Sequence, residues 1–277
     1  MRRHILIKNN SAVAGVIEFL LIIALIAIIL STVQAVYIPD VMSQREADHM
    51  KEVSNELSYL KSIIDLQAMT EKDVPISSPI TLGNDPLPYF VTMGASGGIE
   101  IVEDARFEIN IDFDSTRIPL TKFNFTAYNA YYLQGDDLNY ALEGGAVILN
   151  QTEGEVIRVE PAISVENQST VINIYYDLPI IISIAGKNNT YGSDTVHVRT
   201  NYSSSDATYQ SHTNADNIKI YTDYPEAWKE YLEEILEDNV NYIVNDDNVE
   251  LTKKVKNVNF YYKRTYIYAQ ISPGWIK

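Results

Sequence analysis

The chain has 277 residues, with 37 acidic against 21 basic side chains and a formal net charge of −16. Such an acidic chain repels phosphate backbones, which argues against nucleic acid as a partner. It contains no cysteine, so disulfides, thiol catalysis and cysteine-ligated metals are excluded.

Residues 12–38 form an apolar run interrupted by a single acid, Glu18. As a helix this run would extend about 40 Å, enough to cross a bilayer with some tilt. Its flanks differ in charge: Arg2, Arg3 and Lys8 precede it, and Asp40, Glu46 and Asp48 follow. Because positive flanks stay cytoplasmic, we expect the N-terminus inside and residues 40–277 outside the cell. A cleavable secretory signal is the alternative, but the run is longer than a typical signal core and no small-x-small cleavage site follows it.

The segment after the membrane run predicts a second stretch of helix, within residues 39–72. Apolar side chains recur with alternating spacings of three and four, at Met50, Val53, Leu57, Leu60 and Ile64. This stripe must cover either the globular domain or a neighbouring helix. We expect one long helix over residues 13–69, bent near Pro39.

The region from residue 73 to about residue 215 is typical of short strands separated by turns. The predicted strands lie at 106–113, 146–149, 155–159, 162–165, 170–176 and 180–184. No helical pattern intervenes between them, which favours an antiparallel β-sandwich.

After the strand at 218–221, Thr222 or Asp223 is the expected cap of a helix with Pro225 in its first turn. Trp228, Leu232, Ile235 and Leu236 would form the apolar face of this helix and cover the sheet. Two or three further strands follow it, between residues 240 and 271. The predicted fold class is therefore α+β: a long N-terminal helix, an antiparallel sandwich and one C-terminal covering helix.

Five Asn-x-Ser/Thr sequons lie in the part expected outside the cell. They are Asn124, Asn150, Asn167, Asn188 and Asn201. Their position on one side of the membrane favours an N-glycosylated surface protein.

No recognisable catalytic or metal-binding motif is present, so we expect neither an enzyme nor a cofactor or metal. The four histidines show no metal-ligand or triad spacing, and no nucleotide-binding loop occurs. Acid pairs at Asp112/Asp114, Asp136-Asp137 and Asp246-Asp247 are interpreted as solvated turn residues, although paired carboxylates also serve glycosidases and calcium sites. Two tyrosine-rich stretches, at 128–132 and 260–268, are interpreted as strands that alternate between core and surface, with sugar stacking as the alternative.

The N-terminal segment carries a resemblance to a known family. A short basic leader, small residues and a long apolar helix with one acid near its start resemble the class III signal and helix of archaeal type IV pilins. The segment AVAGVIEFLLI from Ala12 is similar to their N-terminal pattern. The continuation IPDVMSQREADHMKEVSNELSYLKSIID from Ile38 is similar to that of pilin-like surface proteins with a β-rich outer domain.

This resemblance implies processing and assembly. In pilins a class III signal peptidase cuts before the apolar helix, and a glutamate at the fifth mature position meets the amino terminus of a neighbouring subunit. Carried over to Glu18, this makes Ala14 the first mature residue, followed by Gly15, with cleavage after Val13. The residue before the cut then differs from the usual glycine or basic residue, and a start at Ala12 would put Glu18 at position seven. The alternative is a plain anchor in which Glu18 reaches the cytoplasmic interface.

The sequence thus predicts four parts: a basic leader at 1–13, a membrane or filament-core helix at 14–38, a stalk helix at 39–72 and an extracellular β-rich domain at 73–277. We expect a pilin-like structural or adhesive subunit whose partners are the membrane and identical or related subunits. The alternative is a non-polymerising anchored protein that binds glycan or envelope polymer. A less favoured third is an envelope glycosidase using Asp112 and Asp114.

Overall fold

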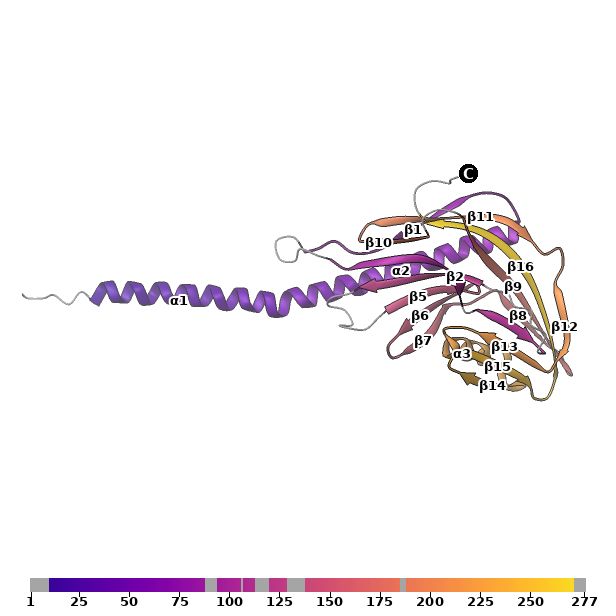
Figure 1. Ribbon diagram of the computed structural model, residues 1–277. Coiled ribbons are helices and arrows are strands. Elements are labelled where there is room, and N and C mark those ends of the chain that lie inside the picture. Colours follow the sequence, from indigo (N-terminus) through magenta and orange to yellow (C-terminus); the bar gives the residue numbers. More distant parts are fainter. Residues whose placement is uncertain are drawn as a thin grey trace, which may run out of the picture.

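The computed structural model describes residues 10–87, 94–105, 107–112, 120–128, 138–184 and 188–271, without the side chains of 10–13, 104 and 120. Most of the leader, Asp114, Asp136-Asp137 and most of the first tyrosine-rich stretch lie outside the described residues. The protein is a long helix that projects from a β-rich domain packed along its C-terminal half (Figure 1). The predicted fold class is confirmed.

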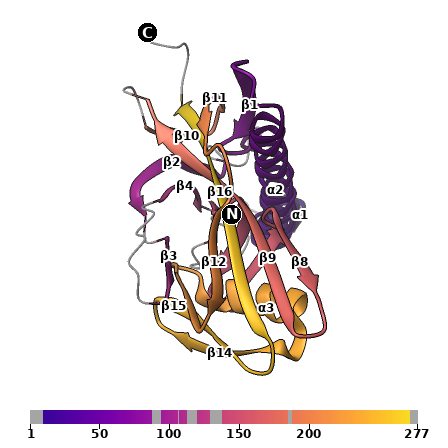
Figure 2. The same ribbon diagram turned by 90° about the vertical axis from the view of Figure 1, so that its right-hand side faces the viewer.

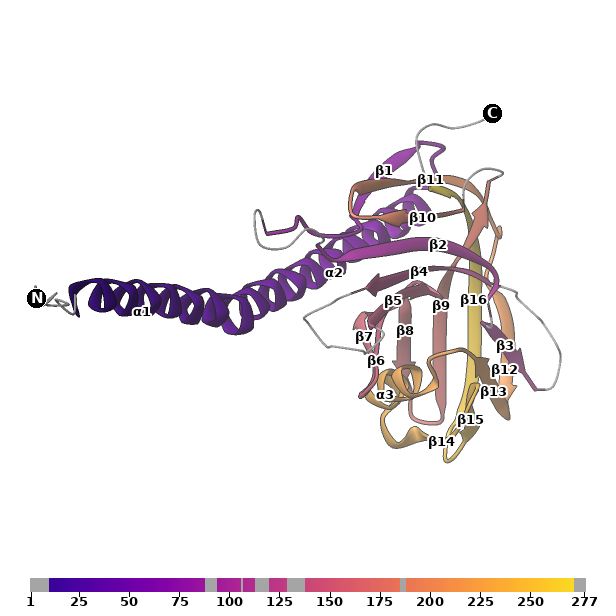
Figure 3. The ribbon, with the colours of Figure 1, turned by 60° about the vertical axis from the view of Figure 1, so that its left-hand side comes forward.

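The long helix runs without interruption through three segments, α1 (Asn10–Thr32), a π-helical turn η1 (Val33–Tyr37) and α2 (Ile38–Thr70). Pro39 has no N–H for the carbonyl four residues before it, and its ring would clash with that carbonyl. The π turn ends at Tyr37, two residues before Pro39, and its wider turn accommodates the proline without ending the helix. The helix changes direction in this region, as predicted (Figure 3). It ends at Glu71, which adopts a left-handed φ of 51° and donates its N–H to the carbonyl of Gln67.

The described strands form two sheets, one of 12 strands and one of four. The large sheet contains β1 (Ile76–Thr81), β2 (Ser96–Ala105), β4 (Leu120–Tyr128), β5 (Leu138–Glu143), β6 (Ala146–Gln151), β7 (Gly154–Val159), β8 (Ile163–Asn167), β9 (Val171–Ser183), β10 (Asn189–Gly192), β11 (Thr195–Ser205), β12 (Gln210–Ala215) and β16 (Asn257–Ile271). The small sheet has the order β14 (Val240–Asn245), β15 (Asn248–Lys253), β13 (Asn217–Tyr221) and β3 (Glu108–Ile111).

One strand pair departs from the expected antiparallel arrangement. The long strands β9 and β16 pair in parallel, from Val171 opposite Asn257 to Ser183 opposite Ala269 (Figure 2). The predicted strands at 170–176 and 180–184 are a single strand, β9, which continues through Pro179. On the side of β9 away from β16, β8 pairs with it up to Tyr176 and β4 pairs with it at Ile181, so Pro179 lies between these two partners.

Helix α2 belongs to the core of the domain. Met50, Val53, Leu57, Leu60 and Ile64 are all at most 4% exposed and pack with apolar side chains of the large sheet. The stripe therefore covers the globular domain, which decides between the two alternatives left open by the sequence.

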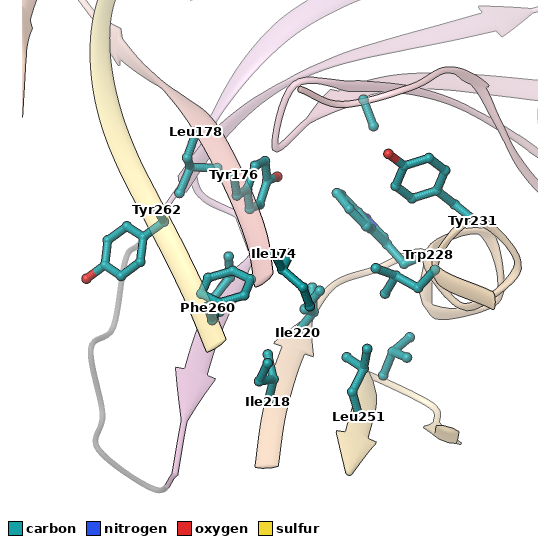
Figure 4. Close-up of a cluster of buried hydrophobic side chains, with 14 of the residues drawn as sticks. Ile174, Tyr176, Leu178, Ile218, Ile220, Trp228, Tyr231, Leu251, Phe260 and Tyr262 are labelled. Atoms are coloured by element: carbon teal, nitrogen blue, oxygen red, sulfur yellow. The ribbon is translucent and has the colours of Figure 1, made fainter. Parts of the chain in front are cut away.

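Helix α3 (Pro225–Leu236) lies against β7, β14 and β15 and completes a second core between the two sheets. Figure 4 shows Trp228 projecting from α3 toward the apolar side chains of this core. Trp228, Leu232 and Leu236 are buried as predicted, and Ile235 is half-buried.

The predicted cap is wrong: Tyr224 is the N-cap residue and makes no side-chain capping bond. The Thr222 hydroxyl donates to Glu143, and the Asp223 carboxylate pairs with Lys122.

Candidate functional site

The first candidate site is the uncovered apolar surface of α1. Every large apolar side chain from Val16 to Leu30 is at least 46% exposed. By length and composition this is the one helix of the described chain that could cross a membrane. A helix that is apolar on all faces must be covered by lipid or by other helices.

Glu18 lies on this surface together with Ala14 and Gly15, the two residues that precede it by four and three positions. This spacing puts all three on one helix face. All three are exposed, and a Cβ added to Gly15 would meet nothing within 4 Å. Among the described residues, the first basic residue along the chain is Arg45, so no basic residue lies near Glu18 in this part of the sequence. The small residues therefore leave room beside the carboxylate for another molecule.

The second candidate site, which we call the buried ionic cluster, consists of Lys122, Glu143, Thr222, Asp223 and Trp228, all buried except Asp223. Lys122 Nζ lies 2.5 Å from Asp223 Oδ2 and 3.7 Å from Glu143 Oε2. Thr222 Oγ1 and Trp228 Nε1 donate hydrogen bonds to Glu143 Oε1 at 2.5 Å and 3.2 Å. Strands β4 and β5, the β13–α3 loop and α3 supply these side chains, so the cluster joins the large sheet to the α3 layer.

Burial dominates the electrostatics of the cluster. Desolvation of Glu143 raises the pKa of its carboxyl to about 7, against the opposing influence of Lys122 and the two hydrogen bonds. Desolvation alone would lower the pKa of Lys122, but the nearby acidic groups, Glu143 first, outweigh it and raise that pKa. The Lys122 ammonium also lies 4.7 Å from the centre of the Tyr224 ring.

The turn after Glu143 is fixed by the core. Gly144 and Gly145 have φ values of +56° and +78°, and a Cβ on Gly144 would lie 2.6 Å from the Tyr176 hydroxyl. That hydroxyl donates to the Gly144 carbonyl oxygen at 2.5 Å. This contact holds the end of β5, and with it Glu143, against β9.

Sequence reasoning missed this cluster. The available signal was the alternation along β4, which places Lys122 on the face opposite to Phe123 and Phe125. A charged side chain on that face indicates a polar partner there. The partners of Lys122 lie 21 and 101 residues further along the chain, and only the fold brings them together.

The predicted acid pairs have structural contacts where they are described. Asp112 Oδ1 accepts the backbone N–H groups of Asp216 and Asn217 at 2.6 Å and 3.0 Å. Asp247 lies in the β14–β15 turn and its Oδ1 accepts a hydrogen bond from Asn248 at 2.7 Å. Among the described residues no group of three or more histidine or acidic side chains could hold a metal ion.

The second tyrosine-rich stretch alternates as predicted along β16. Phe260 and Tyr262 are buried, whereas Tyr261 is half-buried and stacks on Tyr175 with ring centres 4.9 Å apart.

The five sequon asparagines differ in accessibility. Asn167, at the end of β8, is exposed, and the other four are half-buried. The side-chain amides of three of these donate to acidic neighbours: Asn124 to Glu100, Asn188 to Glu103 and Asn201 to Asp73.

A model of a family of unknown function, DUF7289, matches residues 95–267, more than half of the chain. The chain belongs to the DUF7289 family. No curated protein and no solved structure matches it.

The segment matched by DUF7289 begins just before β2 and ends within β16. It includes all five residues of the buried ionic cluster and both sheets apart from β1 and the end of β16. Helices α1 and α2 precede the DUF7289 segment, although α2 packs into the core that this segment forms.

Proposed function

We propose that the protein is a membrane-anchored cell-surface subunit of the type IV pilin kind, which assembles with identical or related copies through its N-terminal helix. The observation that carries this proposal is the contrast within one continuous helix. The β-rich domain covers one face of α2, whereas α1 is apolar and uncovered on every face.

The dimensions and charges of the chain agree with this arrangement. The 23 residues of α1 extend about 35 Å, close to the thickness of a bilayer hydrocarbon core. Basic residues precede the helix and acidic residues follow it, which orients the β-rich domain outward. The acidity of the part beyond α1 suits a surface that remains soluble in water.

Glu18 is the residue on which assembly would depend. A carboxylate within an apolar helix bundle is tolerated when a cation compensates it. Removal of the leader after Val13 would create an amino terminus on each copy, and Ala14 and Gly15 leave space beside Glu18 for that group. The resemblance of the Ala12–Ile22 segment to archaeal class III signals supports this processing.

The decisive experiment is peptide mass spectrometry of the N-terminus of protein isolated from its native membranes. The proposal expects a mature chain that starts at Ala14. An intact Met1, or a start after residue 38, would overturn it.

Assembly itself is tested by cross-linking, for which the absence of native cysteine is an advantage. The substitution Ala24→Cys introduces a single cysteine into α1, and this variant is oxidised in membranes. Covalent dimers are expected if α1 helices pack together. Glu18→Gln should reduce these dimers, whereas Glu52→Gln, at an exposed acid of α2, should not. An absence of covalent dimers would favour a plain anchor, and equal dimer yields in the two variants would show that helix packing does not depend on Glu18.

A second candidate function, an anchored protein that binds glycan without polymerising, is favoured by one groove. This groove of about 370 Å³ lies beside the C-terminal end of α2 and combines the half-exposed Tyr209 with Pro179, Lys263 and Asp177. Aromatic faces beside charged groups are suited to sugars. A glycan array probed with the full chain in detergent tests this function, and saturable binding should weaken in Tyr209→Ala.

A further inference from the structure

The buried ionic cluster has the composition and geometry of a self-modifying site. We propose that Lys122 Nζ condenses with the side-chain carboxyl of Asp223 to form an intramolecular amide bond, with Glu143 as the catalytic acid–base. This inference does not depend on membrane assembly, because it concerns only the β-rich domain.

The two reacting groups are held together from both sides. Lys122 Nζ lies 2.5 Å from Asp223 Oδ2, and the carboxyl carbon is one bond further. Asp223 is flanked by Thr222 and Tyr224, which are 0% and 6% exposed. The Thr222 N–H donates to the Asp247 carbonyl, and the Tyr224 N–H donates to Thr222 Oγ1, both at 3.0 Å. Groups fixed near a separation of roughly 3–3.5 Å react with very high effective molarity.

Glu143 is positioned to move protons at the attacking nitrogen. Its Oε1 is occupied by Thr222 and Trp228, which fixes the orientation of the carboxyl group. Its Oε2 accepts no hydrogen bond from the described residues and lies 3.7 Å from Lys122 Nζ. The pKa of Glu143, raised to about 7 by burial, suits a group that both accepts and returns a proton at neutral pH.

The reaction balances without any co-reactant. A proton first passes from the Lys122 ammonium to the Asp223 carboxylate, against the raised pKa of Lys122, which gives a neutral amine and a neutral acid. The amine lone pair attacks Cγ of Asp223, while the Glu143 carboxylate accepts a proton from the nitrogen. Glu143 then donates this proton to the leaving hydroxyl, the Cγ–O bond breaks, and one water departs. The products are one amide bond and one water, and Glu143 returns to its starting state.

The surroundings favour this outcome. The Lys122 side chain is 7% exposed and that of Glu143 is 0% exposed, so bulk water is excluded from the nucleophile and from the acid–base. The Asp223 side chain is 42% exposed, which opens a route for the released water. In a chain without cysteine, this bond would cross-link residues 101 positions apart and tie β4 to the loop that leads into α3.

The test is peptide mapping of the folded full chain, produced in a host that does not glycosylate asparagine. Trypsin does not cleave after an acylated lysine. Residues 118–158 should therefore remain uncut at Lys122 and be joined to residues 220–229, one water lighter than the sum of the two peptides. The proposal would be overturned if folded protein gave two separate peptides, one that ends at Lys122 and one that contains unmodified Asp223. Lys122 and Asp223 would then form an ion pair only.

Three variants separate chemistry from folding. Lys122→Arg and Asp223→Ala should abolish the linked peptide, since each lacks a reacting group. Glu143→Gln should lose most of it while circular dichroism and tryptophan fluorescence stay native-like. Glu250→Gln is the matched control, because Glu250 pairs with Lys219 at 3.0 Å on a more exposed surface, and the linked peptide should persist in it. A linked peptide that forms equally well in Glu143→Gln would refute the acid–base role.

Discussion

The Glu56 carboxylate of α2 accepts two hydrogen bonds from Thr81 of β1, from the backbone N–H at 2.7 Å and from the hydroxyl at 2.9 Å. Burial raises the pKa of Glu56, although both bonds favour its ionised form. The next residue, Leu57, is 1% exposed and lies in the core of the large sheet. A polar contact and an apolar contact on consecutive residues therefore fix α2 against the domain.

Truncation of the buried face of α2 should destabilise the domain. Leu57→Ala should lower the free energy of unfolding by about 2–5 kcal/mol, because it leaves a cavity in a packed core. The matched control is Tyr59→Ala, at a side chain that is 53% exposed, which should change stability by less than about 1 kcal/mol. Urea unfolding of the full chain in detergent, followed by tryptophan fluorescence, measures both. Equal losses would contradict the packing of α2 on the sheet.

Removal of the indole donor at Trp228 should weaken the buried ionic cluster. Trp228→Phe keeps an aromatic ring but loses the N–H that reaches Glu143 Oε1 at 3.2 Å. We expect a loss of roughly 1–3 kcal/mol, since a buried acceptor loses a partner and the smaller ring leaves space. Lys229→Ala, next to it on α3 and half-exposed, should cost less than about 1 kcal/mol in the same assay. If the two variants were equally stable, the indole bond would contribute nothing.

The raised pKa of Glu143 predicts that stability falls as pH rises. The folded pKa of about 7 lies above the unfolded value of 4.5, so the folded state retains the proton longer. The contribution of protonated Glu143 to the free energy of unfolding is fully present below pH 4.5. It is lost as pH rises toward 7, by roughly 3 kcal/mol in all, since one pKa unit corresponds to about 1.4 kcal/mol.

The pH effect is measured without interference from the proposed amide. The single variant Asp223→Ala cannot form this bond and keeps Glu143. The double variant Asp223→Ala/Glu143→Gln is its reference, because it lacks the titrating carboxyl group. The single variant, which keeps Glu143, should lose stability relative to the double variant between pH 4.5 and pH 7.5, as followed by urea unfolding. A constant difference would show that Glu143 is ionised in the fold throughout this range.

Glycan occupancy should follow the exposure of the sequons. Asn167 is exposed, and its contact with Lys256 engages Oδ1, not the Nδ2 that would carry a glycan. Asn124, Asn188 and Asn201 use Nδ2 to bond acidic neighbours. Glycopeptide mass spectrometry of native protein should find the highest occupancy at Asn167. High occupancy at Asn201 with a bare Asn167 would contradict this order.

Local patterns predicted the elements of this fold with useful accuracy. The spacing of Val53, Leu57 and Leu60 predicted α2, and Pro39 predicted the bend, because both depend on residues within one or two helical turns. The capping prediction for α3 was wrong because Asp223 has a closer charged partner in Lys122. The parallel pairing of β9 with β16 was also unforeseen, since these strands are far apart in sequence and no local signal specifies their relative direction.

The sequence by itself determined the apolar helix with Glu18, the absence of cysteine, the acidic character and the β-rich composition. These properties follow from residue types and short-range periodicity. Only the tertiary structure decided what the α2 stripe covers and which charges meet in the buried ionic cluster. Lys122, Glu143 and Asp223 lie on separate elements, and their pairing depends on how two sheets and a helix pack.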